Sequence, residues 1–263
     1  MKFVILGGGC YGSFYARQLL RARDAGAFDV DEVIVVDREE WPRARREVGP
    51  SPVLRFVVAD WETFLRQYLA SLDAEAEDRI VPPPFTPHLA LAWLLDRLRN
   101  ERPEREWSLA PFGRFPGTPF ERQAPGGPLV VSHADWECPV HCIEPATCPV
   151  TRGPRYWDLD RTVRDFATTL EKAGQPVDQL HLFHCHHVTY GVGAYRAAAV
   201  RHAYEQIASC VEGPGRERVA RFLVGTISHC HGALHLLESR PGTIPVTPAS
   251  PLPPAEITPH PNR

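Results

Sequence analysis

The sequence predicts an α/β protein built on a doubly wound, mostly parallel sheet, with a Cys-rich loop and a helical C-terminal segment. Three observations lead to this class. Short apolar runs alternate with helical patterns along the first hundred or so residues, a glycine-rich turn follows the first apolar run, and three cysteines cluster near the middle of the chain. Alternating strands and helices favour a parallel sheet with right-handed crossover connections.

The N-terminal residues are predicted to form a strand–turn–helix–strand unit. Residues 2–6 are an apolar run of the kind that forms a buried parallel strand, and the turn over 7–12 reads G-x-G-x-x-G. A helix is predicted over about 12–23, and the second strand, 32–37, ends on Asp37.

Each part of this unit has a physical role. Gly7 permits a tight turn, Gly9 lets the backbone approach a pyrophosphate, and Gly12 lets the helix pack closely on the strand. The helix N-terminus offers free N–H groups and a partial positive charge to phosphate. Asp37 stands where a carboxylate can accept hydrogen bonds from a ribose 2′-hydroxyl.

These residues resemble the dinucleotide-binding fingerprint of the Rossmann superfamily, whose members bind NAD, NADP or FAD. The resemblance covers about the first 40 residues and implies a Rossmann-like fold and a cofactor class, not a reaction. The cofactor-binding residues that it implies are Gly7, Gly9, Cys10, Gly12, Asp37 and Arg38. The gap between Gly12 and Asp37 is wider than usual, and an arginine after Asp37 could favour a 2′-phosphate, which leaves NAD and NADP as alternatives. A related fold that has lost its nucleotide, or that binds S-adenosylmethionine, is a further alternative.

The next segments continue the alternation. A third strand is predicted over 53–59, a helix over 61–72, a short strand over 79–81 and another helix over 88–99. Residues 101–127 are rich in proline, glycine and arginine and are predicted to be a surface meander with packed aromatic side chains, with a lid over the nucleotide as the alternative.

A cysteine cluster follows a predicted strand over 128–132. Three of the seven cysteines have the spacing C-x3-C-x5-C, and two of them precede proline. Thiolates favour zinc, copper(I) or iron–sulfur clusters, and the spacing matches neither a ferredoxin loop nor a zinc ribbon. We predict an iron–sulfur cluster first and zinc second, with unrelated loop thiols as the alternative. The predicted metal ligands are Cys138, Cys142, Cys148 and Cys185, and the alternatives for the fourth position are Cys230, His186 and His231. His133 and His141 lie in the same stretch and are further possible ligands.

Histidines cluster after a later strand. A helix is predicted over 157–173 and a strand over 179–183, which leads to the sequence HCHH at 184–187. Ligands of open α/β sheets lie at the carboxyl ends of the strands, so we expect the glycine-rich turn, the cysteine loop and these histidines to share one rim. His184 and His187 are the predicted catalytic proton donors, because histidine titrates near neutral pH.

The C-terminal third is predicted to be helical. A helix is expected over 194–210. A 3.6-residue apolar pattern favours another over 218–238, although residues 222–227 also read as a strand. The helix would place His231 and His235 on one face at a spacing that can hold a metal. Eight of the 27 prolines fall between residues 241 and 261, which predicts a disordered tail. The predicted division is a nucleotide-binding part (1–100), an α/β extension (101–239) and a Pro-rich tail (240–263).

Bulk properties narrow the function. The net charge of −3 gives no basic field for nucleic acid, and the absence of a long apolar run or a signal peptide predicts a cytoplasmic protein without membrane attachment. We predict an NAD(P)- or FAD-dependent oxidoreductase with a thiolate-bound iron–sulfur cluster beside the nucleotide, acting on a small-molecule substrate or with a redox partner protein. A zinc-dependent enzyme with a nucleotide cofactor and a non-enzymatic redox or nucleotide sensor are the alternatives.

Overall fold

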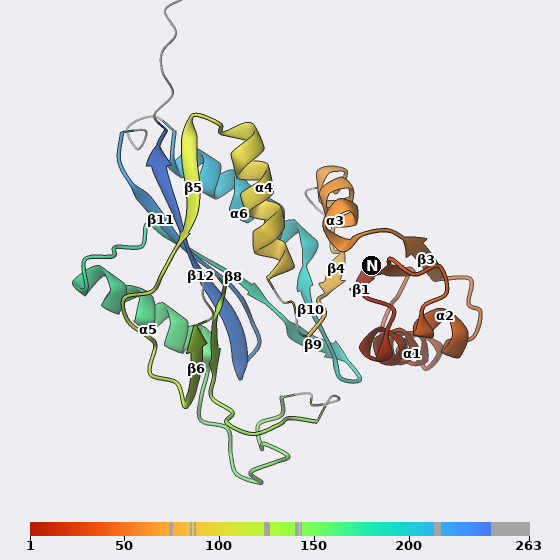
Figure 1. Ribbon diagram of the computed structural model, residues 1–263. Helices are drawn as coiled ribbons and strands as arrows, with labels where there is room; N and C mark the ends of the chain where they lie inside the picture. The colour runs from red at the N-terminus through yellow and green to blue at the C-terminus, as the bar shows by residue number, and fades with distance from the viewer. Residues whose placement is uncertain are drawn as a thin grey trace, which may run out of the picture.

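The computed structural model describes residues 1–73, 76–84, 86, 88–123, 127–139, 142, 144–212 and 217–242. Within these residues the chain forms two six-stranded sheets with helices between and outside them (Figure 1). The predicted α/β class is confirmed. His141 and the predicted tail beyond residue 242 lie outside the described residues.

The first sheet contains the Rossmann-like unit. Its strand order is β3-β2-β1-β4-β10-β9, in which β1 to β4 are parallel and β10 runs antiparallel to β4. Its strands are β1 (Lys2–Leu6), β2 (Glu32–Asp37), β3 (Leu54–Val58), β4 (Arg79–Val81), β9 (His186–Thr189) and β10 (Val192–Arg196).

Both faces of this sheet are buried. Phe3 and Ile5 of β1 pack against α1, whereas Val4 and Leu6 face a core that includes α3, α4 and α6. This is why the sequence of β1 is a continuous apolar run rather than an alternating one.

The helices are α1 (Cys10–Asp24), α2 (Arg43–Glu47), α3 (Trp61–Ala70), α4 (Leu89–Glu101), α5 (Leu159–Lys172) and α6 (Ala197–Cys210).

The second sheet lies across the helical layer from the first. Its order is β6-β7-β12-β11-β8, and β5 also pairs with β12; β8 and β11 are parallel, and the other pairs are antiparallel. Helix α5 covers its outer face (Figure 1). Its strands are β5 (Arg105–Ala110), β6 (Phe120–Gln123), β7 (Leu129–Ser132), β8 (Gln179–His184), β11 (Ala220–Ile227) and β12 (His231–Pro241).

The prediction of a C-terminal helix is wrong, because residues 218–238 form most of β11 and β12. Phe222 of β11 faces the core between the sheets and Leu223 faces α5, so both faces are buried and the strand reads as an unbroken apolar run. Such a run cannot be distinguished from a buried helix by periodicity alone. His231 and His235 share a strand face but stand about 13 Å apart along it, too far apart to bind one metal ion.

Two further segments differ from the predictions. Residues 105–110 and 120–123, predicted to lie in a meander or a lid, are strands β5 and β6. Residues 105–110 form a strand because the distant strand β12 pairs with them, and residues 120–123 because they pair with the nearby β7. Both pairings override a local composition rich in proline and glycine. Helix α6 begins at Ala197 rather than 194, because β10 occupies the preceding residues.

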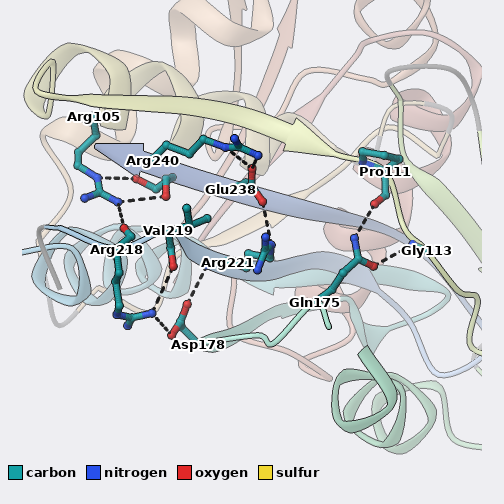
Figure 2. A network of polar contacts seen from close by, with 11 residues as sticks. Arg105, Pro111, Gly113, Gln175, Asp178, Arg218, Val219, Arg221, Glu238 and Arg240 are labelled. Carbon is teal, nitrogen blue, oxygen red and sulfur yellow. Dashed lines mark hydrogen bonds and ion pairs between the residues drawn. The ribbon is translucent and has the colours of Figure 1, made fainter. Parts of the chain in front are cut away.

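Polar contacts join the ends of the strands of the second sheet (Figure 2). Arg105, which is buried, donates to the Ser239 hydroxyl at 2.9 Å, and the Glu238 carboxylate accepts from Arg221 at 2.8 Å and from Arg240 at 2.6 Å. These bonds tie β5, β11 and β12 together at the end remote from the cysteine-rich loop.

Among the described residues, no helix is both long and apolar enough to cross a membrane.

Candidate functional site

The strand order creates a switch point between β1 and β4. The chain passes from β1 to β2 on one side of β1, then returns through β3 and α3 to place β4 on the other side. Ligands of open α/β sheets bind outside the carboxyl ends of the strands at such a point. The glycine-rich turn follows β1 there, and Pro82–Pro84 follow β4.

The glycine-rich turn brings α1 close to β1 and leaves open space at the start of the helix. A Cβ atom on Gly12 would lie 1.9 Å from the carbonyl oxygen of Gly7, so only glycine allows α1 to approach β1 this closely. A Cβ on Gly9 would meet nothing within 4 Å, which leaves open space at the start of α1. No side chain caps α1 and its first turn carries no acid, so its N-terminus suits an anion.

The Asp37 carboxylate stabilises this turn through hydrogen bonds with backbone amides. Its carboxylate accepts the Gly8 amide at 2.6 Å and the Glu39 amide at 2.9 Å. Arg38 turns away and pairs with Asp60, donating through Nε at 2.9 Å. Contacts of these two side chains with a ribose or a 2′-phosphate therefore stay predictions.

A cavity of about 660 Å³ opens beside the switch point. Its walls come from α1, from the residues after β4, from the cysteine-rich loop between β7 and α5, from the β8–β9 junction and from the β11–β12 turn. Figure 1 shows the described part of the cysteine-rich loop in green, below the second sheet. The polar and thiol groups that line the cavity are Tyr15, His88, Cys138, Cys142, Glu144, Cys185, His187, Thr226, Ser228, Cys230 and His231. Its volume lies within the range of small-molecule sites.

The structure brings some of the predicted site residues into this cavity and leaves others outside its walls. Cys138, Cys142, Cys185 and His187 line it. His184 does not, and its ring stacks on that of His186 with 4.2 Å between the ring centres. The buried Cys148 and the glycine-rich turn also lie outside the lining, although α1 reaches the cavity through Tyr15. The shared rim expected at the end of one sheet stays a prediction, since β7 and β8 belong to the second sheet and β1 to the first.

A carboxylate that the sequence did not single out anchors the cysteine-rich loop. Glu144 adopts a left-handed backbone conformation (φ 48°) and accepts hydrogen bonds from the Ser228 hydroxyl at 2.7 Å, the His229 amide at 3.1 Å and the Cys230 amide at 3.3 Å. Burial alone would raise the pKa of Glu144, but the Ser228 and His229 bonds hold it below its usual range. No local pattern reveals this role, because its partners lie more than 80 residues away.

Replacing Glu144 with alanine is expected to lower the free energy of unfolding by about 2 kcal/mol, because three donors of the β11–β12 turn lose a charged acceptor. Urea denaturation followed by tryptophan fluorescence measures the change. Glu144→Gln retains an acceptor oxygen and should lose less. The exposed Glu137 of the same loop is the matched control, and a loss in Glu137→Ala equal to that in Glu144→Ala would contradict this assignment.

Burial sets the ionisation of the other cavity groups. It lowers the pKa of His187 and of His231, and Glu144 opposes the shift in both, so both imidazoles are largely neutral at neutral pH. Nδ1 of His187 is buried without a hydrogen-bond partner among the described residues. Burial raises the pKa of Cys185 to about 12 and that of Cys230 to about 11, which keeps these thiols neutral at neutral pH unless they bind a metal.

The predicted metal ligands do not converge on a single point. Within the described part of the chain, no three histidine, cysteine or acidic side chains stand close enough together to hold one metal ion. Cys185 lies where the chain leaves the second sheet for the first, and its amide donates to Ile227 of β11 at 2.7 Å. Iron–sulfur or zinc binding therefore stays a proposal.

The comparisons with known proteins each match a part of this chain. No curated protein matches the chain. A solved structure that matches is the Bordetella bronchiseptica enzyme WbmF in complex with NAD+ and UDP, at 22% identity and a TM-score of 0.24. This match covers 37% of the present chain and 31% of WbmF, so it spans less than a third of that enzyme. A family model matches residues 90–240, more than half of the chain, and the protein therefore belongs to the family described as "Uncharacterized protein, C-terminal domain".

Proposed function

We propose that this protein is a nucleotide-dependent oxidoreductase whose reaction takes place in the 660 Å³ cavity. The observation that carries the proposal is the position of that cavity. It lies against α1 and the residues after β4, where the strand order reverses and where open α/β sheets bind their ligands. The open space at Gly9 and the uncapped start of α1 fit a pyrophosphate at the adjacent turn.

The groups that line the cavity suggest which step of the reaction the cofactor would carry out and which step the protein would carry out. A bound nicotinamide dinucleotide would supply or accept a hydride. In the direction of reduction, a substrate takes two electrons and one proton as that hydride, and His187 supplies the second proton from its ring after drawing it from solvent. Prolines, glycines and Ile227 line much of the cavity, which favours a small, largely apolar substrate and limits water around the reacting atoms.

The cysteine-rich loop is the second part of the proposal. It adjoins the cavity through Cys138 and Cys142, so a thiolate-bound redox centre there would lie next to the substrate. The chain would then combine hydride chemistry at the dinucleotide with one-electron transfer at the loop.

Dinucleotide binding is the direct test. Titration with NADH, with NADPH and with FAD, followed by fluorescence, is expected to give saturable binding of at least one of them. Gly9→Val should weaken that binding at least tenfold, because the new side chain fills the space that the pyrophosphate needs. Gly49→Val is the matched control, since a Cβ at Gly49 also meets nothing within 4 Å but lies away from the switch point.

Turnover tests the proton donor. NADPH and NADH oxidation, followed by absorbance against a panel of small aldehydes and ketones, is expected to identify a substrate. His187→Gln should then lower kcat by about 10²- to 10⁴-fold without changing dinucleotide affinity. Absence of binding of all three dinucleotides at about 1 mM would overturn the proposed function.

A further inference from the structure

We propose that His231 is the hydrogen-bond acceptor that selects a hydroxy ketone or hydroxy aldehyde as the substrate of the cavity, and that Ser132 positions its ring for this role. The substrate class rests on the proposed function. The tautomer of the His231 ring, in contrast, is a property of the protein alone and can be measured without cofactor or substrate.

His231 and Ser132 stand directly opposite each other on paired strands. The antiparallel register of β7 and β12 pairs these two residues, and the Cβ atoms of such a pair lie within about 5.5 Å of each other. Nδ1 of the imidazole lies 3.3 Å from the Ser132 hydroxyl oxygen. The β11–β12 turn fixes the backbone here, because the Ser228 amide donates to the His231 carbonyl at 2.7 Å. Strand pairing thus sets the position of the ring.

The Ser132 hydroxyl decides which ring nitrogen of His231 carries the proton. Ser132 is buried, and its single hydroxyl proton goes to the Ala134 carbonyl oxygen at 2.7 Å, because that oxygen can only accept. The Ala134 amide donates to the same hydroxyl oxygen at 2.9 Å. A neutral imidazole has one N–H and one nitrogen lone pair. Nδ1 is therefore the nitrogen that donates to Ser132, and Nε2 keeps the lone pair.

The lone pair of Nε2 is directed into the cavity. His231 lines the cavity and Ser132 does not, so the Nδ1 edge of the ring faces the wall and the opposite edge faces inward. Among the described residues, Ser132 is the one group to which the ring is hydrogen-bonded. The nearby Glu144 carboxylate already accepts the donors of the β11–β12 turn. Nε2 is therefore an acceptor that a ligand or water must satisfy.

An acceptor in this position favours a ligand that carries a donor. Much of the cavity lining is apolar, so a purely apolar ligand that displaced the water would leave Nε2 without a partner. Sites that hydrogen-bond a substrate hydroxyl discriminate strongly against analogues that lack it, for this reason. A hydroxyl group on the substrate is the donor that fits.

His187 and His231 together define the substrate, since both line the cavity. In the proposed reduction, the hydride goes to the carbonyl carbon and His187 gives its proton to the carbonyl oxygen. The neighbouring substrate hydroxyl keeps its own proton and donates a hydrogen bond to Nε2 of His231, so no covalent bond forms or breaks there. A ligand that meets both imidazoles carries a carbonyl and a hydroxyl group, and the product is a diol.

The first test reads the tautomer directly. Two-bond ¹H–¹⁵N spectra of the full chain at about pH 8, where histidine is neutral, distinguish the tautomers, and His231→Asn identifies the resonances. The wild type is expected to carry its proton on Nδ1. Ser132→Ala should give a mixture of both forms, and Ser132→Thr should restore the wild-type pattern because it keeps the hydroxyl. A proton on Nε2 in the wild type, or an unchanged spectrum in Ser132→Ala, would refute the proposal.

The second test compares matched ligands. Hydroxyacetone is paired with butanone, in which a methyl group replaces the hydroxyl, and longer pairs of the same kind follow. Hydroxy ketones alone are expected to move the Nε2 resonance, and the wild type should reduce them with a kcat/KM at least about tenfold above that of their partners. His231→Asn keeps an N–H toward Ser132 but has no group at the Nε2 position, so it should lose this preference. His229→Asn is the matched control, because His229 belongs to the same turn but does not line the cavity.

Three results would overturn the substrate class: equal kcat/KM values within the pairs, retention of the preference in His231→Asn, or an Nε2 resonance that no hydroxy ketone moves. Dinucleotide titration of the same samples separates the two proposals. Absence of dinucleotide binding would refute the proposed function, while the tautomer and the Nε2 shift are still measured without cofactor. Dinucleotide binding and turnover of ketones without a hydroxyl preference would refute only this inference.

Discussion

Lowering the pH from 7 to 4 is expected to reduce the free energy of unfolding by about 3 kcal/mol at each of two buried histidines, His181 and His235. Burial, together with a neighbouring imidazole (His202 for His181 and His88 for His235), lowers the pKa of each to about 4. In the unfolded chain the same side chains take up a proton below about pH 6.5. Between these values the unfolded state binds more protons, so acid favours unfolding, and the stability present above about pH 6.5 is lost as the pH falls towards 4.

Guanidinium denaturation at pH 7, 6, 5 and 4 measures this loss. His181→Leu and His235→Leu should each flatten the pH dependence by about 3 kcal/mol over that range, whatever their effect at pH 7. His202→Gln removes an exposed imidazole and should change the slope much less. An unchanged slope in His235→Leu would show that the pKa of this ring is not lowered in the folded protein.

Replacing Gly12 with alanine is expected to lower the free energy of unfolding by about 3 kcal/mol or more, at the upper end of the range for overpacked cores. The new Cβ would lie 1.9 Å from the Gly7 carbonyl oxygen, which belongs to the backbone and cannot swing away. Helix α1 must then move off β1, and the apolar contacts of Ala16 and Leu19 with the sheet are weakened. Thermal and urea denaturation both report the change.

Gly9→Ala is the matched control for this substitution. It adds the same methyl group three residues earlier, where a Cβ meets nothing within 4 Å, so stability should change by less than about 0.5 kcal/mol. Equal destabilisation by the two substitutions would mean that the close approach of α1 to β1 does not depend on Gly12.

The order of elements could be predicted where a local pattern and the tertiary structure agree. The strands at 2–6, 32–37 and 79–81 are found at the predicted residues, because both faces of their sheet are buried and β-branched residues fill them. Helix α5 carries its apolar residues on one face, against the second sheet, and is equally evident from its sequence. In these segments the same residues satisfy local preference and long-range packing.

Prediction failed where long-range pairing decides. Residues 220–227 have apolar side chains at helical spacing, but their strand pairs with β8 on one side and β12 on the other. The strands β5 and β6 likewise form because β12 and β7 offer edges to pair with. β8, the parallel partner of β11, and β12, the partner of β5, lie far away along the chain, whereas the β11–β12 and β6–β7 pairs join segments that are close in sequence.

The glycine-rich turn, the strands and helix around it, and the cysteines and histidines that could form a site are all evident from the amino-acid sequence. They are evident because a phosphate-binding turn and a thiol cluster are local patterns with their own chemistry. The tertiary structure alone decided which of those groups share a cavity. It placed His187 in the cavity lining and His184 outside it, revealed Glu144, and brought Cys230 to the loop, because hydrogen bonds and strand pairing join segments more than 70 residues apart.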